Sequence, residues 1–412
     1  VKVKEMNMPV EGGPLPGYPD VPYAQSCSMD RCMARAKEMM DWDSKYPCRD
    51  MGNGKVRGVG VAMAMQGSSI AGVDVGGADI KLNEDGSYTL ALGCTDMGTG
   101  CDTVMAQIAA DCLNTPMDNI VVFSVDTDIS PYDSGSYASA TTYTTGVAVM
   151  KACEELKKKI CKLGAEMMEV DERKVDFDGS CVFYDETLEI SDGAEGNAAG
   201  HMTDAEEGYS VDMDAISSEN AQKKVSLEDI ALKSTFFNNI ELQVVKQHSS
   251  PISPPPFMVG MAEVEVDTET GSVDVLDYVA VVDCGTPINP NLARVQTEGG
   301  IAQGIGMALW EDVQYTDKGK IRNNSFMQYK IPTRQDIGNI RVDFECSYEK
   351  SGPFGAKSIG ELVIDTPCPA LAEAIYNATG VRLTELPMTP EKIAMEILKN
   401  RESTRSGTKV EE

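Results

Sequence analysis

The same order of predicted elements occurs twice along the sequence: a hairpin, a turn that contains Asp and Gly, and then a helix. The first copy begins with the hairpin expected over residues 80–92 and continues through the turn at 96–100. The second copy begins with the hairpin expected over 262–282, and its turn starts at Asp283. Because each copy combines strands with a helix, the sequence predicts an α+β fold of two related α/β lobes, in which mixed sheets with flanking helices close on one cleft.

Local composition divides the chain into five segments. Residues 1–26 are rich in Pro and Gly and are expected to form an extended N-terminal arm. Residues 27–184 and 225–400 are the two predicted lobes. Between them, residues 185–224 are acidic, rich in Gly, Ser and Asn and nearly free of aromatic side chains, which predicts a flexible insertion. The last residues, 401–412, are predicted to be a disordered tail.

The charge balance excludes several classes of partner. Acidic residues outnumber basic ones by 65 to 36, which gives a formal net charge of −29 and argues against nucleic acid or an anionic membrane as a partner. No apolar run approaches the ~20 residues of a membrane span. The N-terminus begins at Val1 without a signal-peptide pattern, as in a processed chain or a portion of a longer one. The 12 cysteines form no C-x-x-C pair, which is typical of reduced thiols in a cytoplasmic protein.

Three stretches carry the residue types of a cofactor pocket. In the loop 355–361, two glycines precede one carboxylate, Glu361, so the backbone can pass close to a ligand and present a single acid or base to it. A second Gly-rich turn at 96–100 leads into a helix, and the run 134–141 is rich in hydroxyl groups. We expect these stretches to wall one pocket, with Glu361 facing the reactive atom.

Each of these features also has a purely structural interpretation. The turn at 96–100 is either an anion-binding site made of backbone N–H groups at a helix N-terminus or a tight structural turn. The hydroxyl groups of 134–142 either hold a polar ligand or cap a helix. Glu361 is either a base or a carboxylate stabilised by a helix dipole. His201 and His248 have no partner at metal-ligand spacing and are expected to be surface residues.

Four motifs occur together in the order of one known family. They are Asp96-Met97-Gly98-Thr99-Gly100, then Ala138-Ser139-Ala140-Thr141, then the run 283–306 with Ile288-Asn289-Pro290 and Gln296-x-Glu298-Gly299, and finally the loop 355–361. This set resembles the molybdenum-binding subunit of the xanthine dehydrogenase / aldehyde oxidoreductase family. The likeness covers about residues 27–180 and 225–400.

The resemblance implies a role for particular residues. Glu361 matches the family's catalytic base, and no side chain is expected to ligate the metal directly. The residues implied in binding the cofactor are Met97, Gly98, Thr99, Gly100, Cys101, Ala138, Ser139, Ala140, Thr141, Gln296, Lys357 and Gly360.

Two departures from the family pattern change what is expected. Thr99 stands where the family usually has glutamine. The R-G-F-G-x-P and G-G-x-F-G segments, which supply the other half of the family's pocket, are absent from the sequence. The chain therefore resembles the C-terminal half of a molybdenum subunit whose N-terminal half is a separate polypeptide, as in nicotinate dehydrogenase and selenium-containing hydroxylases. Such a chain is expected to be active only with its partners.

The resemblance also implies a reaction. The family hydroxylates an N-heterocyclic aromatic, such as a purine (xanthine) or nicotinate, with water as the oxygen source. The implied cofactor is molybdopterin, in the cytosine dinucleotide form, with molybdenum and a terminal sulfido or selenido ligand. Electrons are expected to leave through [2Fe-2S] and FAD partner subunits. The alternatives are an aldehyde- or carbon monoxide-oxidising enzyme and a non-catalytic subunit that supports the cofactor.

Overall fold

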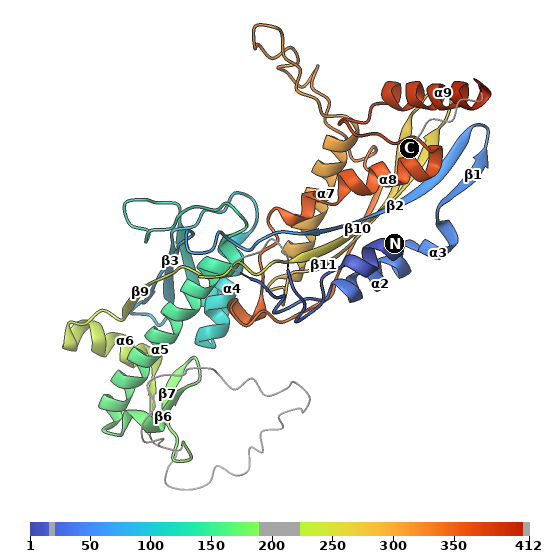
Figure 1. Ribbon diagram of the computed structural model, residues 1–412. Coiled ribbons are helices and arrows are strands. Elements are labelled where there is room, and N and C mark those ends of the chain that lie inside the picture. The colour runs from blue at the N-terminus through green and yellow to red at the C-terminus, as the bar shows by residue number, and fades with distance from the viewer. Residues whose placement is uncertain (16–20, 189–222, 407–412) are drawn as a thin grey trace.

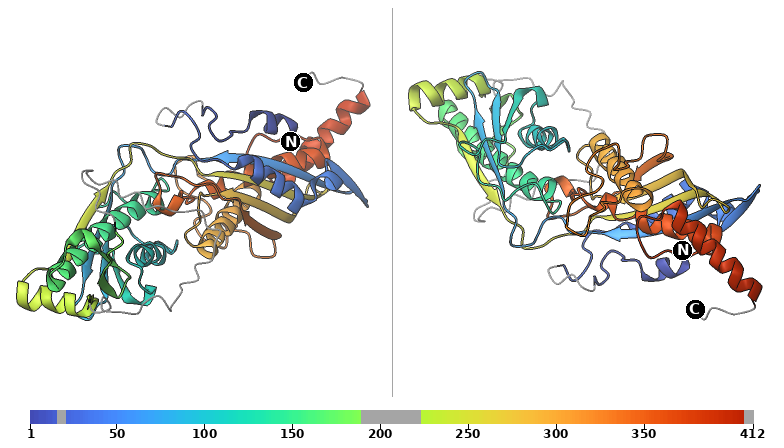
Figure 2. Two further views of the ribbon diagram at one scale, coloured as in Figure 1. Left: turned by 90° about the horizontal axis from the view of Figure 1, so that it is seen from below. Right: turned by 90° about the horizontal axis from the view of Figure 1, so that it is seen from above.

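The computed structural model describes residues 1–15, 21–188 and 223–406. Its elements form two bodies that lie end to end in an elongated molecule (Figures 1 and 2). One body is built on a five-stranded sheet, and the other on a four-stranded sheet accompanied by a three-stranded one. The predicted combination of sheets with flanking helices is confirmed.

The larger sheet has the spatial order β1 (Cys48–Gly52), β2 (Lys55–Met65), β10 (Phe257–Asp267), β11 (Val273–Asp283) and β12 (Asn339–Phe344). Strands β11 and β12 run parallel, and the other neighbours are antiparallel. The apolar runs of β10 and β11 are buried on both faces because helices cover the sheet on both sides. Helix α2 (Met29–Met40) packs on one face, and α7 (Pro290–Leu309) and α8 (Pro367–Thr379) pack on the other.

Helix α8 approaches β2 so closely that two strand positions must be glycine. A Cβ atom on Gly58 would lie 2.2 Å from the carbonyl oxygen of Ala374, and one on Gly60 would lie 2.1 Å from that of Ala370. This close contact holds α8 against the sheet and fixes the position of the loop that precedes it. That loop ends in Glu361.

The smaller body is a sheet with two long helices on one side. Its strands have the order β5 (Ile120–Ser124), β4 (Tyr88–Leu92), β3 (Gly76–Leu82) and β9 (Gln243–His248). Helices α4 (Cys101–Leu113) and α5 (Gly146–Met168) pack against it through one apolar cluster. The remaining elements of this body are β6 (Val175–Phe177), β7 (Cys181–Tyr184), β8 (Lys224–Ser226) and α6 (Leu227–Leu232).

The chain crosses twice between the two sheets. Strand β2 pairs with β10 along its whole length, from Lys55 opposite Asp267 to Met65 opposite Phe257. Strand β9, from the second predicted lobe range, lies in the four-stranded sheet and pairs with β3. Each sheet therefore contains strands from both predicted lobe ranges, 27–184 and 225–400. These pairings join residues far apart in the chain, such as Lys55 with Asp267 and Gly76 with His248, so the local sequence pattern does not reveal them.

The structure corrects the expectations for both ends of the chain. The arm 1–26 is not wholly extended, because it contains helix α1 (Lys2–Asn7), whose Lys4 pairs with Glu373 of α8 at 3.3 Å. Helix α9 (Pro390–Ser406) continues into the tail that was expected to be disordered, because no Gly or Pro interrupts 391–406. Residues 407–412, and 189–222 of the predicted insertion, lie outside the described residues. Helix α3 (Trp42–Lys45) completes the elements.

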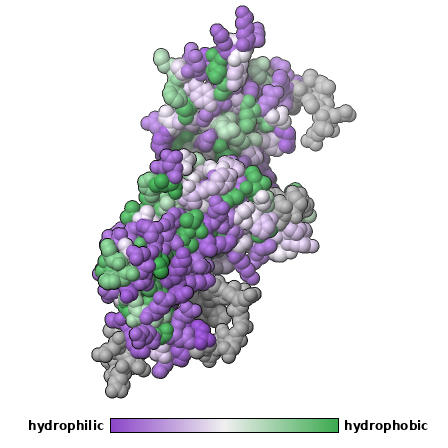
Figure 3. Space-filling model, turned by 90° about the vertical axis from the view of Figure 1, so that its left-hand side faces the viewer, coloured by the Kyte–Doolittle hydropathy of each residue, from purple (hydrophilic) through white to green (hydrophobic). Residues whose placement is uncertain are grey.

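The helices of the described residues are all too short or too polar for a transmembrane segment. On the face drawn in Figure 3, hydrophobic residues (green) lie among hydrophilic ones (purple).

Candidate active site

A cavity of about 370 Å³ lies between the two bodies. The smaller body contributes the start of α4 and the loop before α5, and the larger body contributes the start of α7 and the loop 355–361. Ten of the twelve predicted cofactor-binding residues border the cavity, as does Glu361, while Gly98 and Gly100 lie in the same turn without lining it. The structure thus brings together the three stretches that were expected to wall one pocket.

Glu361 lies at the mouth of this cavity with one carboxylate oxygen held in place. Its Oε2 accepts hydrogen bonds from Nε2 of Gln66 at 2.7 Å and from Oγ of Ser139 at 3.3 Å. The backbone N–H of Glu361 donates to the same Ser139 Oγ at 3.0 Å. Nε2 of Gln296 donates to the carbonyl oxygen of Gly360 at 2.8 Å. The carboxylate is therefore oriented from both bodies, while Oε1 makes no hydrogen bond to a described residue.

The loop is anchored by a buried ion pair rather than by its glycines alone. The ammonium group of Lys357 lies 3.0 Å from Oδ1 of Asp283, and both side chains are fully buried. The same ammonium lies 5.0 Å from the centre of the Phe257 ring, which adds a cation–π contact. Asp283 also accepts hydrogen bonds from Ser28 and Ser347. Lys357 thus borders the cavity with its backbone only, and its side chain points into the core.

The opposite wall of the cavity, residues 138–142, has an unusual backbone conformation. Ala138 and Ser139 have φ angles of 49° and 54°, in the left-handed region that non-glycine residues rarely adopt. The following residues, Thr141–Thr145, form a π-helical turn before α5. Within it, the N–H of Tyr143 donates to Oγ of Ser358 at 2.9 Å, which ties this wall to the loop 355–361. Strained backbone of this kind persists only where the surroundings hold it.

The Gly-rich turn is not an open anion-binding site, which corrects one of the two interpretations above. The N–H groups of Gly98 and Gly100 donate to Oδ1 of Asp96 at 2.8 and 3.1 Å. Burial acts to raise the pKa of Asp96, but these backbone hydrogen bonds outweigh it and keep the pKa below its ordinary value. A carboxylate of the chain itself therefore occupies the positive end of α4. The turn contributes Met97, Thr99 and Cys101 to the cavity wall.

The described residues offer one group of side chains close enough to share a metal ion: Asp96, Cys101 and Asp102, with ligand atoms within 4.8 Å of one another. Oδ1 of Asp96 already accepts hydrogen bonds from backbone N–H groups. Oδ2 of Asp102 accepts a hydrogen bond from Ser124 at 3.2 Å. The cavity-lining Cys284 is a thiol at neutral pH, because burial raises its pKa to about 12.

A model of the molybdopterin cofactor-binding domain matches residues 35–338. The chain belongs to this family. The molybdopterin-binding chain is 34% identical over 380 residues to the Escherichia coli K12 protein named "Probable hypoxanthine oxidase XdhD", covering 90% of this chain and 35% of that protein. It is 28% identical over 375 residues to the xanthine dehydrogenase molybdenum-binding subunit of Escherichia coli O157:H7, covering 89% of this chain and 46% of the relative.

Fold similarity extends to quinoline 2-oxidoreductase from Pseudomonas putida 86. Its crystal structure matches the molybdopterin-binding chain with a TM-score of 0.77 at 22% identity, covering 91% of this chain and 46% of that one. The family model and the Escherichia coli relatives confirm the resemblance to the xanthine dehydrogenase / aldehyde oxidoreductase family. The chain spans less than half the length of each of these three proteins.

The cavity lining fits the ring system of a molybdopterin. Ile288 and Leu292 supply apolar surface, and Thr99, Ser136 and Thr141 supply hydroxyl groups for hydrogen bonds, a combination that suits a polar heteroaromatic ring. The lining offers little for the cofactor's phosphate. Lys357 is the one basic residue among the described lining residues, and its ammonium is paired with Asp283.

Gln66 is the residue of this site that the sequence did not reveal. It follows directly after the last residue of β2, and its position at the end of a buried strand is the only local signal. We expect Gln66→Leu to lower kcat of the assembled enzyme about tenfold, because one charge-assisted hydrogen bond that orients Glu361 is lost. Steady-state kinetics tests this, with Gln247→Leu, which changes an exposed glutamine on β9 that lines neither cavity, as the control. An unchanged kcat for Gln66→Leu would remove the residue from the site.

Proposed function

We propose that this chain is the C-terminal half of the molybdenum-binding subunit of a molybdenum hydroxylase. Its substrate is an N-heterocyclic aromatic such as a purine or nicotinate, and water is the oxygen source. The observation that carries the proposal is the placement of Glu361. Its carboxylate borders the cofactor cavity. Oε2 accepts hydrogen bonds from Gln66 and Ser139, and Oε1 makes none to a described residue.

The chain's own residues account for the proton chemistry of such a reaction. When bound, the molybdenum cofactor supplies the redox centre that accepts the substrate's electrons as oxygen is transferred. Glu361 acts as the general base, because it is the one carboxylate among the described lining residues of this cavity. Ser139 and Gln66 hold its Oε2, so the proton is taken at Oε1. Gln296 fixes the Gly360 carbonyl and thereby the direction of the loop.

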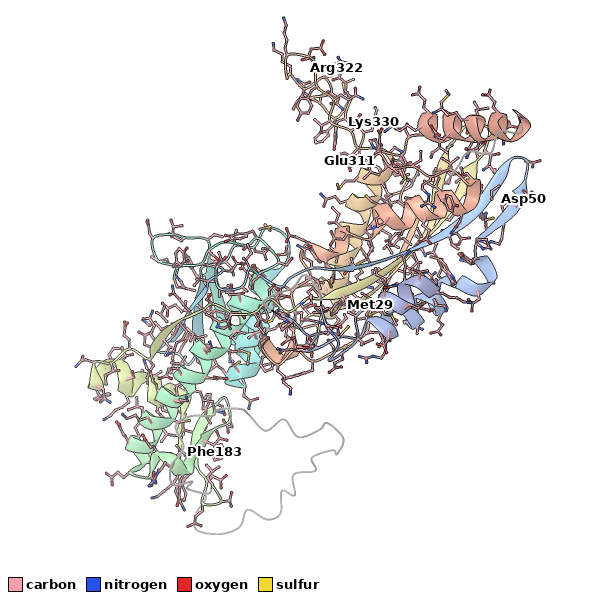
Figure 4. The ribbon with its side chains drawn as sticks, viewed as in Figure 1. Met29, Asp50, Phe183, Glu311, Arg322 and Lys330 are labelled. Atoms are coloured by element: carbon pink, nitrogen blue, oxygen red, sulfur yellow. The ribbon has the colours of Figure 1, made fainter. Side chains whose placement is uncertain are left out.

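A projecting arm of the chain supports the need for partner chains. Residues 311–338, between α7 and β12, stand away from the body of the molecule, and Figure 4 shows Glu311 at the base of this arm and Arg322 near its outer end. The arm is internally ordered, since Oη of Tyr329 donates to Glu311 at 2.6 Å. Its Phe326 and Met327 are more than four-fifths exposed. Apolar groups so placed are typical of a surface that a partner covers.

Elemental analysis of the purified complex tests the proposed class of enzyme. We expect one molybdenum per copy of this chain, with selenium if the terminal ligand is selenido. Copper with molybdenum would indicate a carbon monoxide-oxidising enzyme instead. Mass spectrometry of the metals, with the complex stripped of cofactor by denaturation as the blank, distinguishes these outcomes. Absence of molybdenum from an intact complex would contradict the proposal and favour a non-catalytic subunit.

The name of one relative favours a purine among the candidate substrates. The Escherichia coli protein that matches 90% of this chain is named as a hypoxanthine oxidase. Oxidation of hypoxanthine or xanthine by the complex, with a dye as electron acceptor, is the direct assay. The partners expected in that complex are the N-terminal half of the molybdenum subunit, a [2Fe-2S] subunit and an FAD subunit.

A further inference from the structure

A second cavity, of about 560 Å³, lies on the other side of Glu361. It shares Gln296, Gly360 and Glu361 with the first cavity, so the carboxylate stands between the two. The rest of its lining comes from the end of β2, one side of α7 and the turn after the catalytic loop. These residues are Gln66, Gly299, Gly300, Gln303, Val363, Ile364 and Asp365.

The charged groups in this second lining are all acidic. Among the described lining residues they are Glu361 and Asp365, and the lining has no Lys or Arg. Partial burial raises the pKa of Asp365, and the neighbouring Glu361 carboxylate raises it further. Both carboxylates make the electrostatic potential in this cavity negative, which opposes the entry of an anionic ligand.

The polar groups in the lining are amides. Gln66 and Gln296 each use an N–H in the hydrogen bonds described above, which leaves each a carbonyl oxygen and a second N–H. The side chain of Gln303 makes no hydrogen bond to a described residue. Because an amide both donates and accepts, three of them suit a neutral ligand whose edge alternates N–H and C=O groups.

We propose that this second cavity is the substrate side of Glu361 and that Asp365 makes it selective for charge. It admits a neutral heterocycle with amide-like edges and disfavours a heterocyclic carboxylate of the same size. The inference rests on the proposed function, because it takes Glu361 to act on a substrate between the two cavities. It goes beyond that function by separating neutral substrates from nicotinate and by assigning the separation to Asp365.

Nicotinamide and nicotinate are a matched pair of probes, since they differ in one group and in charge. Calorimetric titration of the purified complex should show at least tenfold tighter binding of nicotinamide. In Asp365→Asn, we expect the ratio of the two dissociation constants to shift about tenfold toward nicotinate, the effect of removing one charge at a distance of several ångströms. Asp365→Glu, which keeps the charge, should retain the wild-type preference. Asp43→Asn, which removes an exposed carboxylate on α3, is the matched control and should not change the ratio.

The outcomes separate this inference from the proposed function. Equal binding of the two probes, no binding of nicotinamide, or a ratio that Asp365→Asn leaves unchanged would each overturn the charge selection. Turnover of hypoxanthine by the same complex is measured alongside. If the complex oxidises no heterocycle, the proposed function fails, and the cavity is not a substrate site whatever its selectivity. If it oxidises heterocycles but favours nicotinate, the function stands and the inference falls.

Discussion

Replacement of Glu361 by glutamine is expected to lower kcat of the assembled enzyme about 10³-fold, in the range by which a positioned general base accelerates a reaction. Glutamine has the same shape as glutamate, and its carbonyl oxygen can still accept from Gln66 and Ser139. It cannot take up a proton. The loss should therefore appear in kcat, while the molybdenum content and the thermal stability of the complex remain those of the wild type.

The control for this variant removes a carboxylate elsewhere. Glu385 is exposed and lines neither cavity, so Glu385→Gln should keep wild-type turnover. Activity of Glu361→Gln above about a tenth of the wild-type value would exclude Glu361 as the base. Loss of molybdenum from the Glu361→Gln variant would show instead that Glu361 is needed to bind the cofactor.

Lys357→Met is expected to lower the free energy of unfolding by about 3–5 kcal/mol, the usual cost of removing one partner of a buried ion pair. The variant leaves the carboxylate of Asp283 uncompensated in the core. It also loses the cation–π contact with Phe257. Because Lys357 precedes Glu361 by four residues, the loop should loosen and kcat should fall as well. Urea denaturation of the purified complex measures the first effect.

An exposed lysine of the same loop region serves as the control. Lys350→Met should change the free energy of unfolding by less than about 0.5 kcal/mol. The double variant Lys357→Met/Asp283→Asn carries no buried charge at this position. Its loss of stability should therefore be smaller than the sum of the two single losses. If Lys357→Met were as stable as Lys350→Met, the buried pair would not anchor the loop.

The sequence predicted the elements and the site motifs because their signals are local. The helix expected after the turn at 96–100 is α4, and the hairpin expected over 80–92 is formed by β3 and β4. Gly360 and Glu361 were assigned from a short motif, and the structure places them beside Ser139 although more than 200 residues separate them.

What the sequence did not predict depends on contacts between distant segments. The pairing of β2 with β10 moves residues 48–65 into the other body, and nothing in their own pattern indicates that partner. Lys357 was assigned to the cofactor because it lies in the loop 355–361, which resembles the family's motif. Its burial against Asp283 became visible only in three dimensions. The carboxylate of Asp96 likewise accepts hydrogen bonds from the N–H groups of Gly98 and Gly100, which leaves the structural-turn interpretation of 96–100 and not the anion-binding one.

The most direct test is to locate the metal in crystals of the purified complex by anomalous scattering at the molybdenum edge. We expect a peak in the cavity bordered by 97–101, 138–142 and 356–361, with the Glu361 carboxylate within hydrogen-bonding reach, ~2.6–3.2 Å or one water away, of the atoms around the metal. A molybdenum peak outside that cavity, or a Glu361 side chain directed away from the metal, would contradict it.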